Sequence, residues 1–133
     1  MMPFLMAAAA VHVLAGVFWA GVTFVQARTG GVLGLRLLGA QLGAAAFAVI
    51  SGGYMWSVLH RGQFEPAEQT LALGAAAALL AAGVQGVAGA AVALARRRGT
   101  PDDPAAQRRI ATAQRLAAAL LAVTIVCMAT SRY

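Results

Sequence analysis

Two histidines are the residues of this chain best suited to bind a metal ion or a haem. His12 lies inside a long apolar run, and His60 follows a second such run. A neutral imidazole is a common ligand of haem iron and of metals. An ionisable side chain inside a membrane span is by default a candidate functional residue. His12 is therefore either a cofactor ligand or a packing residue hydrogen-bonded to Thr124, Gln85 or a carbonyl.

Sulfur side chains near the same ends of the apolar runs offer further donors. Sulfur and imidazole together suit soft metals such as Cu(I), although methionine on a membrane helix is also ordinary apolar filling. The candidate metal ligands are His12, His60, Met55, Cys127 and Met128. The candidate residues of a cofactor pocket are His12, His60, Trp19 and Thr124.

Other chemistry finds little support in the sequence. The acidic residues all lie in predicted loops as helix-start residues: Glu65, Glu68, Asp102 and Asp103. The chain has no phosphate-binding loop and no Ser–His–acid set. A proton- or ion-coupled transporter usually needs a buried carboxylate. We leave open whether the chain is an enzyme and favour a role that is not enzymatic.

Four long stretches without a charged side chain must position these residues. They cover residues 1–27, 37–59, 69–95 and 116–131. A bilayer core about 30 Å thick needs about 20 apolar helical residues. The fourth stretch reaches that length if residues 110–113 join it and Arg115 extends its head to the interface. The sequence predicts one domain, an all-α integral membrane protein with four transmembrane helices in an antiparallel bundle, spanning about 3–26, 37–59, 67–95 and 110–131.

Charge predicts the orientation of this bundle. The net charge is +6 and 11% of residues are charged. All ten basic residues are arginines, and eight of them lie in the first and third predicted loops or beside them: Arg28, Arg36, Arg96, Arg97, Arg98, Arg108, Arg109 and Arg115. The positive-inside rule places these loops in the cytoplasm and both termini outside, an N-out/C-out topology. Because the charge is explained by topology, we expect no nucleic-acid partner.

Polar residues inside the spans recur at helical spacing. In the first span His12, Gly16, Trp19, Thr23 and Gln26 share one helix face, which we expect to turn away from lipid because unpaired polar groups are costly there. The fourth span has a weaker stripe, made of Ala113, Ala117, Leu120, Thr124, Cys127 and Ser131. Gln41 and Gln85 are the other buried amides. We expect these faces to meet in the bundle interior.

Small residues predict close helix packing, either inside the bundle or against another subunit. They are Gly39-x-x-x-Gly43, the Gly52-Gly53 pair, Gly83, Gly86 and Gly89. The lipid bilayer is the first expected partner, and other membrane subunits or a second copy of the chain are the next. The sequence leaves monomer and oligomer open.

Three segments carry a resemblance to a known group. The run from Val11 to Gly21, VHVLAGVFWAG, is similar to the LHI-x-A-x-x-x-W-x-G opening helix of small bacterial membrane proteins related to copper-resistance protein D (CopD) and to HemJ-type protoporphyrinogen oxidases. The segments ISGGYM (50–55) and MATSRY (128–133) resemble short, four-span members of this group. The resemblance implies that His12 is a haem or metal ligand, with Trp19 and Gly21 completing its motif.

The resemblance also implies a bacterial inner-membrane location. HemJ-type enzymes carry further charged and histidine residues just after the first span, and residues 27–30 offer no such cluster. The leading hypothesis is a small membrane protein that binds a b-type haem or copper near the outer face for electron transfer or metal handling. The alternative is a cofactor-free accessory subunit of a larger respiratory, photosynthetic or transport complex.

Overall fold

The computed structural model describes residues 2–30, 34–60, 66–100 and 103–131. The described residues form four α-helices: α1 (Met2–Thr29), α2 (Gly34–Leu59), α3 (Pro66–Arg97) and α4 (Pro104–Thr130). Each helix is long and apolar enough to cross a membrane. The predicted fold class is confirmed: this is an all-α, multi-pass membrane protein whose helices pack as a bundle.

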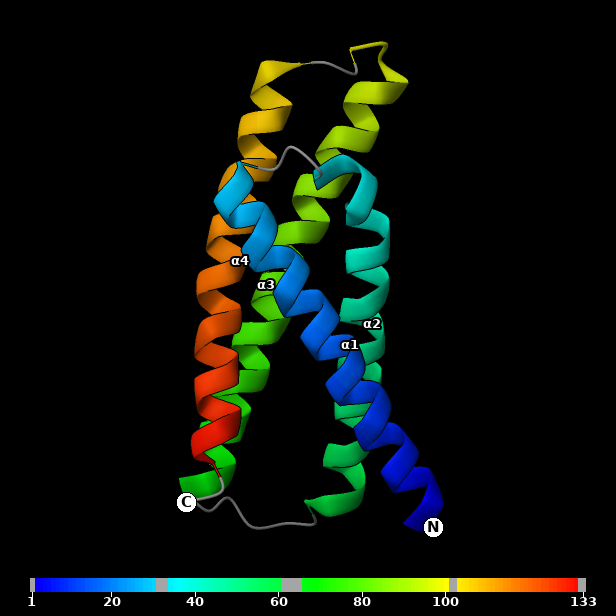
Figure 1. Cartoon of the computed structure of the whole chain (residues 1–133), viewed down its shortest axis with the longest axis vertical. Coiled ribbons are helices and arrows are strands. Elements are labelled where there is room, and N and C mark those ends of the chain that lie inside the picture. Colours follow the sequence, from blue (N-terminus) through cyan, green and yellow to red (C-terminus); the bar gives the residue numbers. More distant parts are fainter. Residues whose placement is uncertain (1, 31–33, 61–65, 101–102, 132–133) are drawn as a thin grey trace.

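The helices run up and down and neighbour one another in chain order. The most extensive contacts join α3 to α4 and α1 to α2, and smaller contacts join α1 to α4 and α2 to α3. Helix α1 crosses the bundle obliquely, and it begins at the end where α4 finishes (Figure 1). We call this end the terminal end. The opposite end, where α3 and α4 extend further than α1 and α2, is the arginine end.

Two glycines and an aspartate set helix ends at the arginine end. Gly30 and Gly99 have φ values of 68° and 77°, and they follow the last residues of α1 and α3. Glycine adopts this left-handed conformation without a Cβ penalty. At the start of α4, Asp103 Oδ1 accepts a hydrogen bond from the Ala105 amide at 2.9 Å, with Pro104 at the first helical position. Asp103 is one of the predicted helix-start residues, and it is the observed N-cap of α4. The predicted helix-start residues Glu65 and Asp102 lie outside the described residues.

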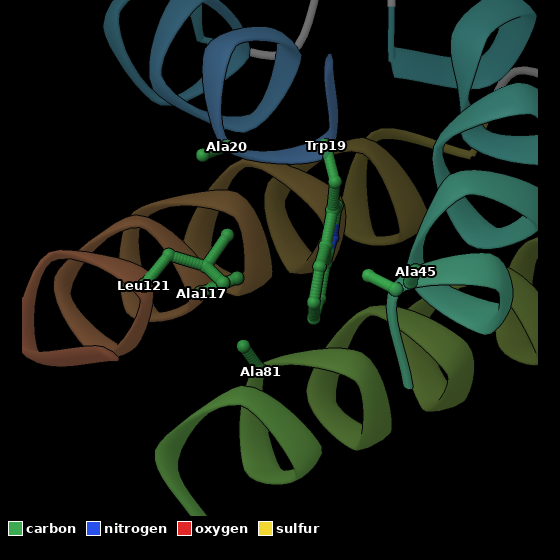
Figure 2. Packing of buried hydrophobic residues seen from close by; sticks show 7 residues of the cluster. Trp19, Ala20, Ala45, Ala81, Ala117 and Leu121 are labelled. Atoms are coloured by element: carbon green, nitrogen blue, oxygen red, sulfur yellow. The ribbon is translucent and has the colours of Figure 1, made fainter. Parts of the chain in front are cut away.

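Alanine dominates the centre of the bundle. The indole of Trp19 from α1 lies among Ala45 of α2, Ala81 of α3 and Ala117 of α4 (Figure 2). Small side chains allow four helices to approach this one large ring closely. A second apolar cluster, nearer the arginine end, joins α3 and α4 through Ala88, Val92, Ala106, Ile110 and Ala113.

Helical glycines divide into two groups by what a built Cβ would meet. Of those predicted to pack closely, Gly52 and Gly89 belong to the group in contact, and the group without contacts includes Gly39, Gly43, Gly53 and Gly83. Gly74 and Gly89 lie against neighbouring helices, since a Cβ built on either would stand 2.9 Å from a side-chain atom of Cys127 or Leu38. Others have nothing within 4 Å of a built Cβ and are exposed on the bundle surface: Gly21, Gly39, Gly43, Gly53 and Gly83. The Gly39-x-x-x-Gly43 motif therefore does not pack inside this bundle.

Three exposed arginines, Arg28, Arg36 and Arg109, lie at one level of the bundle. Arg28 lies five residues after Thr23 on α1, and Arg36 lies five residues before Gln41 on α2. A hydrogen bond joins the Gln41 amide to the Thr23 hydroxyl, so both arginines lie about 7.5 Å further along their helices. Arg109 holds the same position on α4, five residues from a buried glutamine. Arginine heads favour the membrane surface, so we expect this arginine level to be one boundary of the apolar core.

Candidate functional site: His12 and the buried amide network

The His12 imidazole lies against a glycine of α2. A Cβ built on Gly52 would stand 2.9 Å from His12 Cε1 and 3.2 Å from Nδ1. Real Cβ atoms do not approach that closely, so the ring occupies space that any other residue at position 52 would fill. His12 and Gly52 come from two of the segments that carried the sequence resemblance. The structure brings these two segments into contact.

A backbone carbonyl fixes the orientation of the ring. His12 Nδ1 lies 2.8 Å from the Ala48 carbonyl oxygen. A carbonyl only accepts, so Nδ1 donates, and in a neutral imidazole Nε2 then carries the lone pair. Ser51 Oγ lies further from Nδ1, at 3.4 Å, and bonds to the Phe47 carbonyl. His12 makes no hydrogen bond through Nε2 to any residue that the structure describes.

Metal-binding histidines usually have this arrangement. One ring nitrogen donates to a carbonyl or carboxylate, which fixes the tautomer and leaves the other nitrogen for the metal. His12 is half-buried in the structure. Of the two sequence alternatives, the carbonyl hydrogen bond is present, and it leaves the ligand role open at Nε2.

Met55 is the candidate sulfur ligand that lies on the same face of α2 as the His12 contact. It lies four residues after Ser51 and three after Gly52, which places it one turn nearer the terminal end of α2. Its side chain is half-buried. A thioether and an imidazole are a ligand pair used for haem iron and for Cu(I).

His60 lies at a different depth from His12. It comes eight residues after Gly52, or about 12 Å of helix, and it stacks on Trp56 with ring centroids 4.6 Å apart. Its Nε2 lies 3.9 Å from Glu68 Oε1. Counting about 20 residues from the arginine level puts the far edge of the apolar core near Trp56. His60 then lies about 6 Å outside that edge, and His12 about 6 Å inside it.

The remaining candidates lie on the seam between α3 and α4. Thr124 Oγ1 donates to the Gly74 carbonyl at 3.0 Å, and the side chains of Cys127 and Met128 lie beside the same glycine. His12 instead contacts α2. The structure therefore does not bring Thr124, Cys127 or Met128 to the His12 ring.

Trp19 belongs to a buried hydrogen-bond network instead of the histidine site. It lies seven residues from His12, about 10.5 Å along α1, and its Nε1 donates to Gln85 Oε1 at 2.7 Å. Because the indole N–H can only donate, it fixes the orientation of the Gln85 amide. The amide network comprises Trp19, Thr23, Gln41, Gln85 and Gln114, with at least one residue from each helix.

The groups of this network satisfy one another almost completely. The Gln85 Nε2 amide donates to Thr23 Oγ1 and to Gln114 Oε1, both at 3.0 Å. The Gln41 amide donates to the same two oxygens and accepts from Gln114 Nε2 at 3.1 Å. Thr23 in turn donates to the Trp19 carbonyl at 2.7 Å. Such a network holds the helices in one arrangement, because slipping any one of them breaks several bonds.

Gln114 is the network member that the sequence pattern did not predict. Its neighbour Arg115 indicated the membrane interface, and the stripe on the fourth span began one residue away, at Ala113. In the structure Gln114 is 1% exposed whereas Arg115 is exposed. Helical spacing could have indicated that Gln114 is buried, because it lies three residues before Ala117, a residue of the predicted stripe. Trp19, Thr23 and Gln26 on α1 are buried as predicted.

No group of three or more His, Cys, Asp or Glu side chains gathers within residues 2–30, 34–60, 66–100 and 103–131. A site with two protein ligands, one histidine and one methionine, does not require such a group. The chain matches no family model, no curated protein and no solved structure. The likeness to the copper-resistance protein D and HemJ-type group therefore stays a prediction.

Proposed function

We propose that this protein binds a b-type haem or a copper ion through His12 Nε2 and serves in electron transfer or metal handling. The observation that carries this proposal is the 2.8 Å contact from Nδ1 to the Ala48 carbonyl, which leaves Nε2 as the lone-pair nitrogen. Met55 is the second donor we favour, because it shares the face of α2 that His12 contacts.

The residues present fit such a group in chemical type. An imidazole and a thioether are soft neutral donors, suited to Cu(I) and to haem iron. Gly52 provides room for the ring, and Ala48 fixes its orientation. A bound haem or copper would supply one-electron chemistry, and the chain itself would hold and orient it about 6 Å below the membrane surface.

The positive-inside rule supports a cytoplasmic arginine end. The chain termini and His12 then lie on the opposite, outer side. For a bacterial inner membrane, this places the proposed site near the periplasmic face, where it would exchange electrons or metal with extracytoplasmic partners.

The first experiment is a dithionite-reduced minus oxidised absorption spectrum of the detergent-purified protein, with iron and copper quantified on the same sample. We expect about one haem or one copper per chain. His12→Ala should lose the cofactor and stay folded, whereas His60→Ala, the matched control, should retain it. Stoichiometric cofactor in the His12→Ala variant would refute the proposal.

A second variant locates the other donor. Met55→Leu keeps the volume of the side chain and removes its sulfur, so it should weaken binding or shift the reduction potential. Met128→Leu is the control, because Met128 lies beside Gly74 on the α3–α4 seam. An unchanged potential and affinity in Met55→Leu would remove Met55 from the site and leave His12 in place.

An accessory-subunit role is the second candidate. It is favoured by the outward Gly39-x-x-x-Gly43 motif, which has nothing within 4 Å of either built Cβ. Small-xxx-small faces are common at helix–helix interfaces in membranes. If the purified protein contains neither iron nor copper, this candidate takes precedence. Native electrophoresis after mild solubilisation would then show co-migration with a larger assembly, and a Gly43→Ile variant would migrate alone.

A further inference from the structure

Arg115 begins deeper in the membrane than the arginines of the arginine level. It comes six residues after Arg109 on α4, so its Cα lies about 9 Å further from the expected edge of the apolar core. The neighbouring Gln114 is buried in the amide network, whereas Arg115 is exposed. On the outer surface of a membrane-spanning bundle, an exposed side chain at this depth faces lipid. Arg115 is therefore attached inside the apolar core, on the lipid-facing surface of α4.

No described residue offsets the charge of this side chain. Arg115 makes neither a hydrogen bond nor an ion pair within residues 2–30, 34–60, 66–100 and 103–131. A charged side chain in the apolar core is costly unless its head reaches the membrane surface or finds a partner. Helical side chains lean toward the N-terminus of their helix, and α4 begins at the arginine end (Figure 1). We therefore expect the Arg115 guanidinium to reach over the preceding turn toward the lipid headgroups on that side.

Thr112 lies on that preceding turn, and its hydroxyl is unused. It comes three residues before Arg115, so the two side chains are neighbours on the exposed surface of α4. Each of the other five threonines in α1 to α4 donates its hydroxyl to the carbonyl four residues earlier: Thr23, Thr29, Thr70, Thr124 and Thr130. Thr112 makes no hydrogen bond through its side chain to a described residue. A guanidinium and a hydroxyl can both donate to an anion, and here they lie together near the edge of the apolar core.

This face of α4 continues with charge in one direction and with apolar residues in the other. Arg108 is exposed and lies one turn beyond Thr112, at the arginine end. Toward the terminal end the face continues with the exposed Ala119 and Val123. We call the surface made by Arg108, Thr112, Arg115, Ala119 and Val123 the Arg115 face. Its groups follow the order that an anionic phospholipid requires, with positive charge at the membrane surface and apolar side chains below it.

We propose that the Arg115 face binds one anionic phospholipid of the leaflet at the arginine end, with the phosphate held by Arg115 and Thr112. A guanidinium can donate two parallel N–H bonds to phosphate oxygens, and the threonine hydroxyl donates another. Arg108 lies near the headgroup and selects for net negative charge, because a zwitterionic headgroup would bring its own cation close to this arginine. The acyl chains then lie along Ala119 and Val123.

Native mass spectrometry of the detergent-purified protein tests this site, with dioleoyl-phosphatidylglycerol or dioleoyl-phosphatidylcholine added. The wild type should retain one phosphatidylglycerol more strongly than phosphatidylcholine. Arg115→Gln should weaken phosphatidylglycerol binding about fivefold, the effect of one arginine near a membrane surface. Arg36→Gln is the matched control, because it removes the same charge from an exposed position on α2, and it should bind like the wild type. Equal retention of the two lipids by the wild type, or wild-type binding by Arg115→Gln, would overturn the proposal.

A second variant separates a phosphate site from general attraction by positive charge. Thr112→Val keeps the charge and the shape of the side chain and removes only the hydroxyl, so phosphatidylglycerol binding should weaken about threefold. Thr130→Val, at the other end of α4, should bind like the wild type. Displacement of the lipid by millimolar inorganic phosphate would overturn the proposal, because the site would then take a free anion. If Arg115 instead pairs with an acidic residue of another subunit, the purified chain would retain both lipids equally.

Discussion

The two polar regions inside this bundle differ in how completely their hydrogen-bonding groups are used. In the amide network, Gln85 uses both N–H groups and its carbonyl oxygen on other residues of the bundle. At the other region, one nitrogen of His12 is bound to α2 and the second makes no hydrogen bond to a described residue. Both regions lie in the apolar core, and they are about 10 Å apart along α1.

Because of this difference, we expect the amide network to stabilise the fold and the His12 region to bind a ligand. A network whose members satisfy one another has little left for a substrate, and its effect is to fix the packing of α1 to α4. An imidazole held by one nitrogen is oriented but chemically available through the other. Variants of the first region should therefore alter stability, and variants of the second should alter cofactor content.

The largest effect is expected for Gln85→Leu. It removes a residue with three hydrogen bonds and leaves the Trp19 N–H without its acceptor. Interhelical hydrogen bonds in membranes contribute about 0.6 kcal/mol on average, and an orphaned buried donor costs about 1–3 kcal/mol. We expect a loss of about 2–4 kcal/mol, measured by unfolding in mixed detergent micelles.

Gln69→Leu is the control for this prediction, because Gln69 is exposed on the same helix. It should unfold like the wild type. If Gln85→Leu were equally stable, the network would not be what holds the helices together.

The four helices, and the residues that share one face of a helix, were largely predictable from sequence. The four charge-free runs predicted the four helices, because a bilayer requires that length and composition. The faces carrying Trp19, Thr23 and Gln26 were also predictable, because helical periodicity decides which residues lie together on one helix. Helix α4 begins at Pro104, before the membrane span predicted from about residue 110, and Asp103, one of the predicted helix-start residues, caps it.

The partners across helices were not predictable. Periodicity within a helix does not determine which residue of another helix it faces. The sequence therefore left His12 with three possible partners, and it did not indicate that Gly52 makes the space for the ring. It also placed Thr124 on a face that could meet the first span, whereas in the structure this hydroxyl bonds to Gly74 of α3.

A smaller effect, and one confined to the histidine region, is expected for Gly52→Ala. The new Cβ would stand 2.9 Å from His12 Cε1 and would displace the ring from the Ala48 carbonyl. Changes to groups that orient a metal ligand typically weaken binding by about 10–100-fold. Titration of the cofactor-free protein with haem or Cu(I) would measure this change.

Gly53→Ala provides a control at the next residue, because a Cβ there meets nothing within 4 Å. The two variants differ only in which side of α2 receives one methyl group. Equal cofactor affinity for both would break the proposed link between Gly52 and the site.

The smallest effect is expected for Thr124→Val on the α3–α4 seam. This variant keeps the shape of the side chain and loses the hydrogen bond to the Gly74 carbonyl, a change of about 0.6 kcal/mol. Cofactor content should be unchanged. Thr130→Val is the matched control, because Thr130 is exposed and bonds within its own helix. A Thr124→Val variant that loses cofactor would place this seam in the site after all.

The arginine level should make the depth of His12 in the membrane depend on bilayer thickness. If Arg28, Arg36 and Arg109 anchor three helices at one membrane surface, a mismatch between protein and lipid would be taken up mainly at the opposite surface. His12 lies about 6 Å below that opposite surface in a core of about 30 Å. Shortening the acyl chains by a few carbons would bring the ring up to the headgroups, and longer chains would bury it further. Lipid composition would then regulate how readily water and soluble partners reach His12.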